Sequence, residues 1–342
     1  MKMKQHMTLK DLARELGISP STVSKALNDS PEISAKTKKK VRELADLLQY
    51  YPNSFAQGLK YKRTKTLGVI VPAILSNFFS MVLDGIEEKA SELGYRIIIC
   101  ISKESLEKEK LAIDMLIKSQ VDGILLSPSK ETQASLNIKH LQAPKNYGIP
   151  IVMFDRLIKE IEADKISIND CLEAELATME LIKSGCRNVV YFSGMATTSV
   201  NEERKQGYKK AMENSSATAR IIEIDFSKDE GEKFKSILEE NSIDGILTSD
   251  ELTTVQTARN VLTCGYKIPK DISIIGFTNG KMGENFMPSL TTVDQKAKEQ
   301  GEIAVQTLID RLEDKLPLES IEFILKAEII HRESTKNAMI PI

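Results

Sequence analysis

The sequence predicts two structural parts: a small all-α head that contains a helix-turn-helix, and a larger α/β core with parallel sheets in two lobes. Three observations carry this prediction. Short helical patterns fill the first 50 residues, apolar runs of strand length alternate with helical patterns from residue 66 onward, and a short motif recurs within that second part. We therefore expect a head over 1–50, a hinge over 51–65 and a core over 66–342.

Each of the three helices expected in the head has its own start signal. Thr8 is a suitable N-cap for the first, with Asp11 at the capping-box position, and Gly17 permits a left-handed turn after it. Ser19 and Ser34 are suitable caps for the second and third helices. The side chains expected to be buried are Leu9, Leu12, Ala13, Leu16, Val23, Ala26, Leu27, Val41, Leu44, Ala45 and Leu48.

The second helix of the head has a polar face that suits contact with nucleic acid. This face carries short polar side chains and one long cation: Ser21, Thr22, Ser24, Lys25 and Asn28. Two short helices joined through a glycine turn form a helix-turn-helix, whose second helix can enter a major groove. A small helical bundle without any nucleic-acid role would show the same pattern.

Charge is distributed unevenly along the chain, although the net charge is only −2. Residues 1–65 hold 14 Lys and Arg against 6 Asp and Glu, whereas the remainder holds 33 against 43. A basic head on an acidic core suggests that the head meets a polyanion. Basic runs are often solvated surface, so the charge only supports the helix-turn-helix prediction.

Strand-length runs in the core alternate with amphipathic stretches such as 79–93 and 172–183. The predicted strands are 66–72, 95–102, 122–128, 150–155, 188–194, 220–226, 244–250 and 272–278. This alternation indicates parallel sheets covered on both faces. The motif VDGILLS at 121–127 recurs as IDGILTS at 243–249, which predicts two similar halves with a ligand between them at the carboxyl ends of the strands.

Two long segments closely resemble the head and hinge of the lactose-repressor (LacI/GalR) family of transcriptional regulators: TLKDLARELGISPSTVSKALN and ISAKTKKKVRELADLLQYYPNSFAQGLK. Further motifs resemble that family's effector-binding core, which is built like a periplasmic sugar-binding protein: KTLGVIVP, NFFSMVLDGIEEKASELGY, VDGILLSPS, IPIVMFDR, DGILTSDE, IPKDISIIGF and PSLTTVDQ. The resemblance implies three passages between the lobes, near 166–170, 288–293 and 323–328. Lobe 1 is expected over about 66–167 and 291–325, and lobe 2 over about 168–290 and 326–342.

The resemblance also implies which residues of the head and hinge contact DNA. Pro20, Ser21 and Lys25 occupy base-reading positions, and Lys25 is expected to read guanine because the other two are poor hydrogen-bonding readers. Phosphate-holding positions are matched by Thr8, Ser19, Thr22, Asn28 and Asn53. In the hinge, which also includes Ala56, Leu59 resembles the family's apolar wedge for the minor groove; packing of Leu59 on the core is the alternative.

Effector-binding positions implied by the resemblance cluster at the expected strand ends: Asn77, Phe78, Phe79, Phe154, Asp155, Arg204, Ser249, Asp250, Thr278 and Gln295. An aromatic ring can stack on a sugar, and a carboxylate such as Asp155 can accept two hydroxyl protons. Each of these residues, taken alone, can equally be structural. Because the family often has aspartate where this chain has Thr278, the effector could carry its own acid or lack a hydroxyl there.

Several function classes are excluded by the motifs. There is no Walker loop, no G-x-S-x-G elbow and no zinc-ligand spacing in the sequence, and the glycines at 276, 280 and 283 have the wrong spacing for a dinucleotide fingerprint. We therefore expect no enzyme and no cofactor. The four cysteines are scattered and the three histidines lie far apart, so we expect reduced thiols and no metal site.

A cytoplasmic protein is expected, because no run of eighteen apolar residues and no secretory leader is seen. The resemblance implies a homodimer that reads a pseudo-palindromic double-stranded DNA operator, acts most simply as a repressor, and responds to a small-molecule effector, a carbohydrate or its derivative. The segment after His331 lacks leucine heptads, so no tetramer-forming coiled coil is expected. A solute-binding protein without DNA-directed regulation is the alternative, against which the basic head and the lack of an export signal argue.

Overall fold

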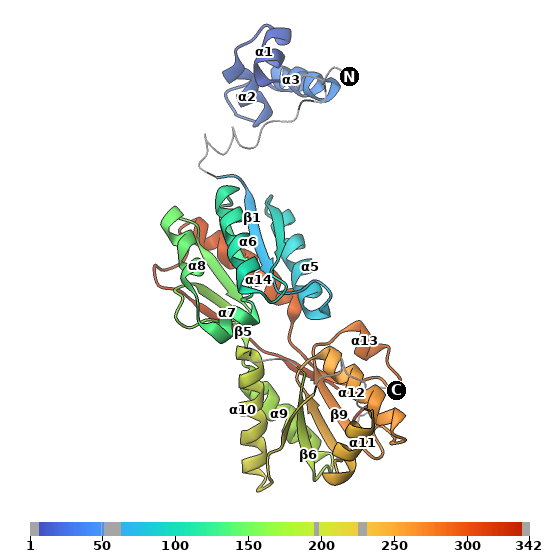
Figure 1. Cartoon of the computed structure of the whole chain (residues 1–342). Helices are drawn as coiled ribbons and strands as arrows, with labels where there is room; N and C mark the ends of the chain where they lie inside the picture. Colours follow the sequence, from blue (N-terminus) through green and yellow to red (C-terminus); the bar gives the residue numbers. More distant parts are fainter. Residues whose placement is uncertain (1–6, 49, 51–62, 195–197, 225–230, 337–342) are drawn as a thin grey trace. The chain divides into compact units, whose positions relative to one another are not determined.

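A computed structural model of the chain describes residues 7–48, 50, 63–194, 198–224 and 231–336 (Figure 1). The chain divides into two compact units, one up to Thr64 and one from Lys65 onward. None of the helices within the described ranges is long and apolar enough to cross a membrane.

The head contains three helices, α1 (Leu9–Leu16), α2 (Pro20–Leu27) and α3 (Ala35–Leu47). Their predicted start signals are confirmed, because Thr8, Ser19 and Ser34 each accept a hydrogen bond from a backbone N–H three residues further on. Gly17 has φ 62°, the left-handed conformation that ends α1. The buried side chains of the head are Leu12, Ala13, Val23, Ala26, Val41 and Ala45.

The first lobe of the core is built on a six-stranded parallel sheet in the order β11-β5-β4-β3-β1-β2. Its strands are β1 (Thr66–Val71), β2 (Arg96–Ile101), β3 (Gly123–Leu126), β4 (Ile151–Phe154), β5 (Asp164–Ile168) and β11 (Glu322–Leu325). The helices of this lobe are α5 (Asn77–Glu92), α6 (Leu106–Lys118), α7 (Lys130–Ser135), α8 (Lys139–Gln142), the 3-10 helix η1 (Ala143–Tyr147) and α14 (Ala297–Leu312). Alternation along β1 explains the two helix layers, since Leu67 and Val69 pack toward α5 and α14 while Ile70 packs toward α6.

The second lobe repeats this architecture with a sheet in the order β12-β10-β9-β8-β6-β7. Its strands are β6 (Val189–Ser193), β7 (Ile221–Glu223), β8 (Gly245–Thr248), β9 (Ser273–Phe277), β10 (Thr291–Asp294) and β12 (Glu328–Ile330), of which only β12 runs antiparallel to its neighbour. Its helices are α9 (Asp170–Lys183), α10 (Ser199–Asn214), α11 (Gly231–Glu240), α12 (Glu251–Thr263) and α13 (Lys281–Glu284). All eight predicted strand segments contain a strand.

The repeated D-G-I-L motif has the same role in both lobes. Its strands, β3 and β8, occupy equivalent positions in the two sheets. Asp122 accepts a hydrogen bond from the N–H of Lys65 (2.9 Å), and Asp244 accepts one from the N–H of Asn188 (2.8 Å). Each carboxylate thereby ties the start of its strand to the chain that enters the neighbouring strand. The motif is repeated because two equivalent sheets need the same connection.

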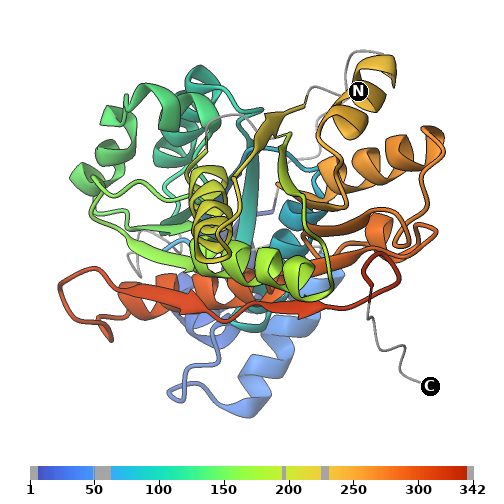
Figure 2. The same cartoon turned by 90° about the horizontal axis from the view of Figure 1, so that it is seen from below.

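Three passages connect the lobes, after β5, after β10 and between β11 and β12. Figure 2 shows the C-terminal segment running from one lobe into the other. The expected start of the second part of lobe 1 at residue 291 is wrong, because β10 pairs with β9 and β12 in the sheet of lobe 2. The passage therefore follows Asp294. Four short strands (β5, β10, β11 and β12) were not predicted, since their sequences mix polar and apolar residues over only three to five positions.

Candidate functional site

The polar face of α2 lies on the surface of the head. Pro20, Ser21 and Asn28 are exposed, and Thr22 and Lys25 are partly exposed. The hydroxyl of Ser19 lies 2.8 Å from those of Ser21 and Thr22, and the amide of Asn28 donates to the carbonyl of Ser24 (2.8 Å). The structure thus brings the predicted residues of α2 onto one accessible face.

Lys25 is not isolated on this face, because its ammonium group forms an ion pair with Glu32 in the segment between α2 and α3. Thr8, a predicted phosphate contact at the start of α1, is exposed and donates its hydroxyl proton to Asp11 (2.6 Å). This hydrogen bond is the main reason that the pKa of Asp11 lies below its ordinary value. The predicted contacts Asn53, Ala56 and Leu59 lie outside the described residues.

A cavity of about 810 Å³ lies between the two lobes of the core. Eight of the ten predicted effector residues line it: Asn77, Phe78, Phe79, Asp155, Arg204, Asp250, Thr278 and Gln295. Its size falls within the range of small-molecule sites. Phe79 packs edge-on against Phe78, with ring centroids 5.3 Å apart.

Two predicted effector residues do not line this cavity. Phe154 is fully buried and packs in the hydrophobic core with Ile166 and Leu308. Its side chain points away from the cavity because it still belongs to β4, in which neighbouring side chains face opposite sides of the sheet. Ser249 is also fully buried, and its hydroxyl donates to Asp250 (2.7 Å). We correct both assignments: these residues support the cavity wall.

Asp155 is the most perturbed acid of the cavity. It has φ 61°, a left-handed conformation that is unfavourable for an aspartate. Burial raises the pKa of Asp155 to about 7, although the charges of Arg156 and Arg204 oppose this shift. Among the described residues no hydrogen bond reaches its carboxylate, and the nearest cation is the Nε of Arg156 at 3.9 Å. Asp155 can therefore accept hydrogen bonds from a ligand.

Arg156 follows directly and was not predicted as a site residue. Its Nη1 donates to both carboxylate oxygens of Glu104 (2.9 and 2.7 Å), and its guanidinium lies 5.6 Å from the ring centroid of Phe79. The buried Nε has no acceptor within the part of the chain that the structure describes. Burial would raise the pKa of Glu104, but the hydrogen bonds and charge of Arg156 hold it below the ordinary value. Arg156 is thus a lining residue of the cavity that is held by Glu104, with its Nε buried 3.9 Å from the carboxylate of Asp155.

Arg204, a predicted effector contact, forms hydrogen bonds mainly with other residues of the protein. Its Nε and Nη2 contact Asp170 (2.7 and 2.6 Å), and its Nη1 donates to the carbonyl oxygen of Ser249 (2.6 Å). Its guanidinium also lies 3.8 Å from the ring centroid of Phe277. Arg204 therefore forms a rigid wall of the cavity. Asp170 was missed by sequence reasoning because it lies 34 residues away and begins a helix, as many aspartates do.

Thr278, which stands where the family resemblance implies an aspartate, is hydrogen-bonded to Gln295. Thr278 has φ 79° and donates its hydroxyl proton to the amide oxygen of Gln295 (2.7 Å). Nearby, Asp250 accepts hydrogen bonds from the backbone N–H and hydroxyl of Thr253 (3.0 and 2.6 Å). This wall consequently offers amide and hydroxyl groups where an aspartate would offer two charged oxygens.

Among the described residues, contacts between side chains of the two lobes include two hydrogen-bonded pairs. The amide of Asn77 donates to Glu251 (3.5 Å), whose other oxygen is buried without a partner among the described residues. The amide of Gln133 donates to the hydroxyl of Ser199 (2.8 Å), and the N–H of Ser199 donates back to the amide oxygen of Gln133 (3.3 Å). Burial raises the pKa of Glu251. These contacts hold the lobes together.

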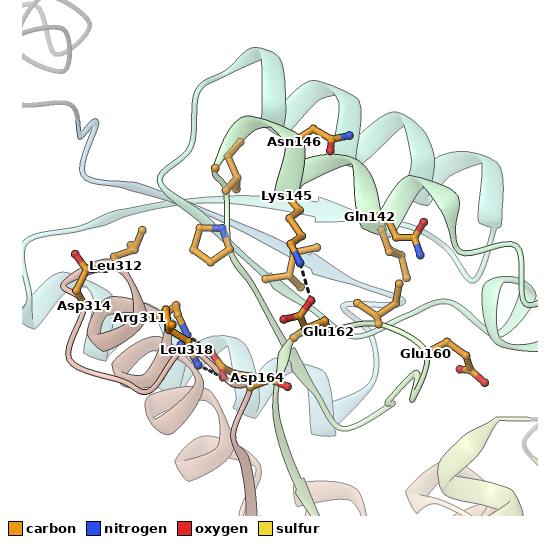
Figure 3. Close-up of a pocket in the computed structure, with 18 residues that line it drawn as sticks. Gln142, Lys145, Asn146, Glu160, Glu162, Asp164, Arg311, Leu312, Asp314 and Leu318 are labelled. Atoms are coloured by element: carbon orange, nitrogen blue, oxygen red, sulfur yellow. Dashed lines mark hydrogen bonds and ion pairs between the residues drawn. The ribbon is translucent and has the colours of Figure 1, made fainter.

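A second cavity, of about 760 Å³, lies within lobe 1 (Figure 3). Four of its charged side chains form two ion pairs: Lys145 with Glu162 (2.6 Å), and Arg311 with Asp164 (2.7 Å). Asp164 also accepts the N–H of Ile321 (2.9 Å). These contacts fasten the segment after α14 to the start of β5, so they have a structural role.

The comparisons with known proteins agree with this division. Residues 8–53 match the model described as "Bacterial regulatory proteins, lacI family", and residues 178–335 match a periplasmic binding protein-like domain. The chain is 30% identical to the ribose operon repressor of Halalkalibacterium halodurans, covering 96% of this chain and 97% of the relative. It is 33% identical to the HTH-type transcriptional repressor PurR of Vibrio atlanticus, covering 96% and 98%.

Among solved structures, the core is similar to a periplasmic binding protein/LacI transcriptional regulator from Alkaliphilus metalliredigens, complexed with D-xylulofuranose. The TM-score is 0.69 at 28% identity, and the match covers 79% of this chain and 99% of that one.

Proposed function

Because the chain belongs to the lacI family of bacterial regulatory proteins, we propose that it is a transcriptional repressor whose affinity for its operator is controlled by a small polyhydroxylated molecule. The head binds the operator, and the molecule binds in the cavity between the lobes. One observation carries the proposal: the same chain has an accessible polar helix in a helix-turn-helix and a separate polar cavity between two lobes.

The head suits DNA because α2 exposes short polar side chains and a lysine on one face. We propose that Pro20, Ser21 and Lys25 meet base edges and that Thr8, Ser19, Thr22 and Asn28 hold phosphates. The proposed hinge contacts Asn53, Ala56 and Leu59 rest on the family resemblance alone. Phosphate contacts release counterions, so affinity should fall steeply as salt rises.

The cavity suits a sugar or sugar derivative for two reasons. Asp155 supplies a carboxylate that has no hydrogen-bond donor among the described residues, and Phe79 adds an aromatic surface. The relative in Halalkalibacterium halodurans is a ribose operon repressor, and the similar structure from Alkaliphilus metalliredigens contains a sugar. Since the family resemblance implies an aspartate where this chain has Thr278, we include sugar acids and deoxy sugars among the candidates.

A two-step experiment tests this function with the full chain. A thermal-shift screen first compares ribose, xylulose, hexoses, disaccharides, deoxy sugars and sugar acids; a compound at a hundred times its Kd should raise the melting temperature by about 5–10 °C. Selection from a pool of randomised duplexes then identifies a preferred sequence, and the shifting compound must change the affinity for it. A protein that shows no duplex preference, with or without the compound, would be a plain solute-binding protein.

We also propose that the chain acts as a homodimer, which would let two heads read a pseudo-palindromic operator. Leu111 and Met115, one turn apart on α6, are exposed apolar residues on the flank of lobe 1. We propose that these two side chains belong to the surface that the second copy covers. Sedimentation at micromolar concentration should give twice the mass of one chain, and a monomer at that concentration would contradict the dimer.

A further inference from the structure

The segment between α2 and α3 places a carboxylate beside the main candidate base reader. Lys25 lies in the last turn of α2, and its ammonium group binds the carboxylate of Glu32 seven residues later. The two side chains are 43% and 65% exposed, so the pair faces solvent. Glu32 is not among the residues that the family resemblance places against DNA.

The backbone that carries Glu32 is held by hydrogen bonds and ion pairs that do not involve the Lys25 side chain. The N–H of Ser30 donates to the carbonyl of Lys25 (3.0 Å), and the N–H of Ile33 donates to the carbonyl of Ser30 (3.2 Å). Before them, Asp29 binds Arg42 and Lys38 of α3. Because α3 and the end of α2 both hold this segment, Glu32 remains next to the polar face of α2.

Other polar side chains on this face of α2 form hydrogen bonds with one another or with the helix backbone, and none of these bonds involves Lys25 or Glu32. The hydroxyls at the start of α2 interact with one another, and Asn28 donates to the helix backbone. Lys25 is the only lysine or arginine within α2. The face therefore has a neutral end with hydroxyls and a charged end with one cation and one carboxylate.

We propose that Lys25 and Glu32 act together as one base-reading unit, in which Lys25 donates to O6 and N7 of a guanine and Glu32 accepts from N4 of a cytosine. This rests on the proposed function. The two groups match the major-groove edges of a G·C pair or of two adjacent G·C pairs, since guanine presents acceptors and cytosine a donor. Glu32 is thereby a specificity-determining residue.

The pair discriminates partly by repulsion. An exposed ion pair is weak, worth at most about fivefold in an equilibrium constant, so Lys25 can turn toward a base at little cost. A carboxylate placed against the acceptors of a wrong base, or near phosphates, is penalised. Glu32 therefore lowers affinity for all duplexes and lowers it most where no cytosine amino group is in reach.

Glu32→Gln in the full chain tests the proposal, with Glu43→Gln as the matched control. Glu43, which pairs with Lys39 on α3, is as exposed as Glu32 (64% against 65%). Selection from a randomised duplex pool should give the wild-type protein a G·C preference of about tenfold at one position per half-site. Glu32→Gln should reduce that preference at least threefold, raise the affinity for unrelated duplexes and steepen the salt dependence. Glu43→Gln should change none of these.

The pair is tested by repeating Glu32→Gln in a Lys25→Met background, where it should no longer alter base preference. An unchanged preference in the single variant, or an equal change in both backgrounds, would overturn the proposal. If the wild-type protein selects no duplex at all, the proposed function itself fails, and this result is distinct from both others. Circular dichroism should give one melting temperature for all variants, because the substituted side chains are exposed.

Discussion

At the scale of single residues, the cavity is lined by charged side chains, most of which have partners within the protein while the carboxylate of Asp155 has no hydrogen-bond donor within the described ranges. Arg204 and Glu104 have firm partners in Asp170 and Arg156. Asp155 has a left-handed backbone conformation, lies 3.9 Å from the Nε of Arg156 and has no hydrogen-bond donor among the described residues. A buried polar group without a partner costs stability.

The raised pKa of Asp155 makes stability depend on pH in a defined direction. Its pKa is about 7 in the folded protein, whereas an aspartate in an unfolded chain titrates near 3.8, so the unfolded chain releases this proton at lower pH. The free energy of unfolding therefore falls as pH rises from about 4 to about 7. Asp155→Asn removes this dependence. The free energy of unfolding of Asp155→Asn minus that of the wild type should be roughly 2 kcal/mol larger at pH 8 than at pH 5.

Urea unfolding at pH 5, 6, 7 and 8 measures this difference. Glu162→Gln, which alters an exposed acid paired with Lys145, is the control and should show no comparable trend. A gap between Asp155→Asn and wild type that stays constant over this range would mean that Asp155 titrates normally.

At the scale of elements, each lobe contains a helix pair that packs backbone against backbone. In lobe 1 a Cβ on Gly301 of α14 would lie 2.2 Å from the carbonyl oxygen of Val82 in α5. In lobe 2 a Cβ on Gly207 of α10 would lie 1.9 Å from the carbonyl oxygen of Cys171 in α9. Glycine is required at both places because the backbone opposite cannot move aside as a side chain would.

Gly301→Ala should therefore destabilise the core by about 1–3 kcal/mol through overpacking. Gly283→Ala is the matched control, since its Cβ would lie an ordinary 3.6 Å from Leu290. Chemical denaturation of the full chain measures both variants. Equal stability of the two would show that α5 and α14 can separate without cost.

At the scale of the whole core, ligand affinity depends on how readily the two lobes close. The described contacts between side chains of the two lobes include Gln133 with Ser199 and Asn77 with Glu251. A ligand that binds only the closed state gains from any contact that favours closure. These contacts consequently tune affinity although Gln133 does not line the cavity.

Gln133→Ala should weaken binding of the effector found in the thermal-shift screen by about three- to tenfold, the value of one or two hydrogen bonds. Gln142→Ala, an exposed glutamine of α8 in the same lobe, should leave the affinity unchanged. Isothermal titration calorimetry gives both values. An unaltered Kd in Gln133→Ala would show that this contact is absent from the bound state.

The sequence by itself determined the local features of this protein. Helix caps such as Thr8, Ser19 and Ser34, the glycine turn and the alternating strands and helices all follow from interactions between near neighbours. The expected ends of the strands also predicted most of the residues that line the cavity, because parallel strands bring their carboxyl ends to one edge of the sheet. The roles of the DNA-contact residues in the head and hinge stay predictions.

Only the tertiary structure decided which side chains meet. Arg156 contacts Glu104 across 52 residues of sequence, Ser199 contacts Gln133 across 66, and Asn77 contacts Glu251 across 174. It also decided that Phe154 and Ser249 lie behind the cavity wall. The physical reason is that a local pattern encodes backbone hydrogen bonds and burial, whereas a distant partner is set by how sheets and lobes pack.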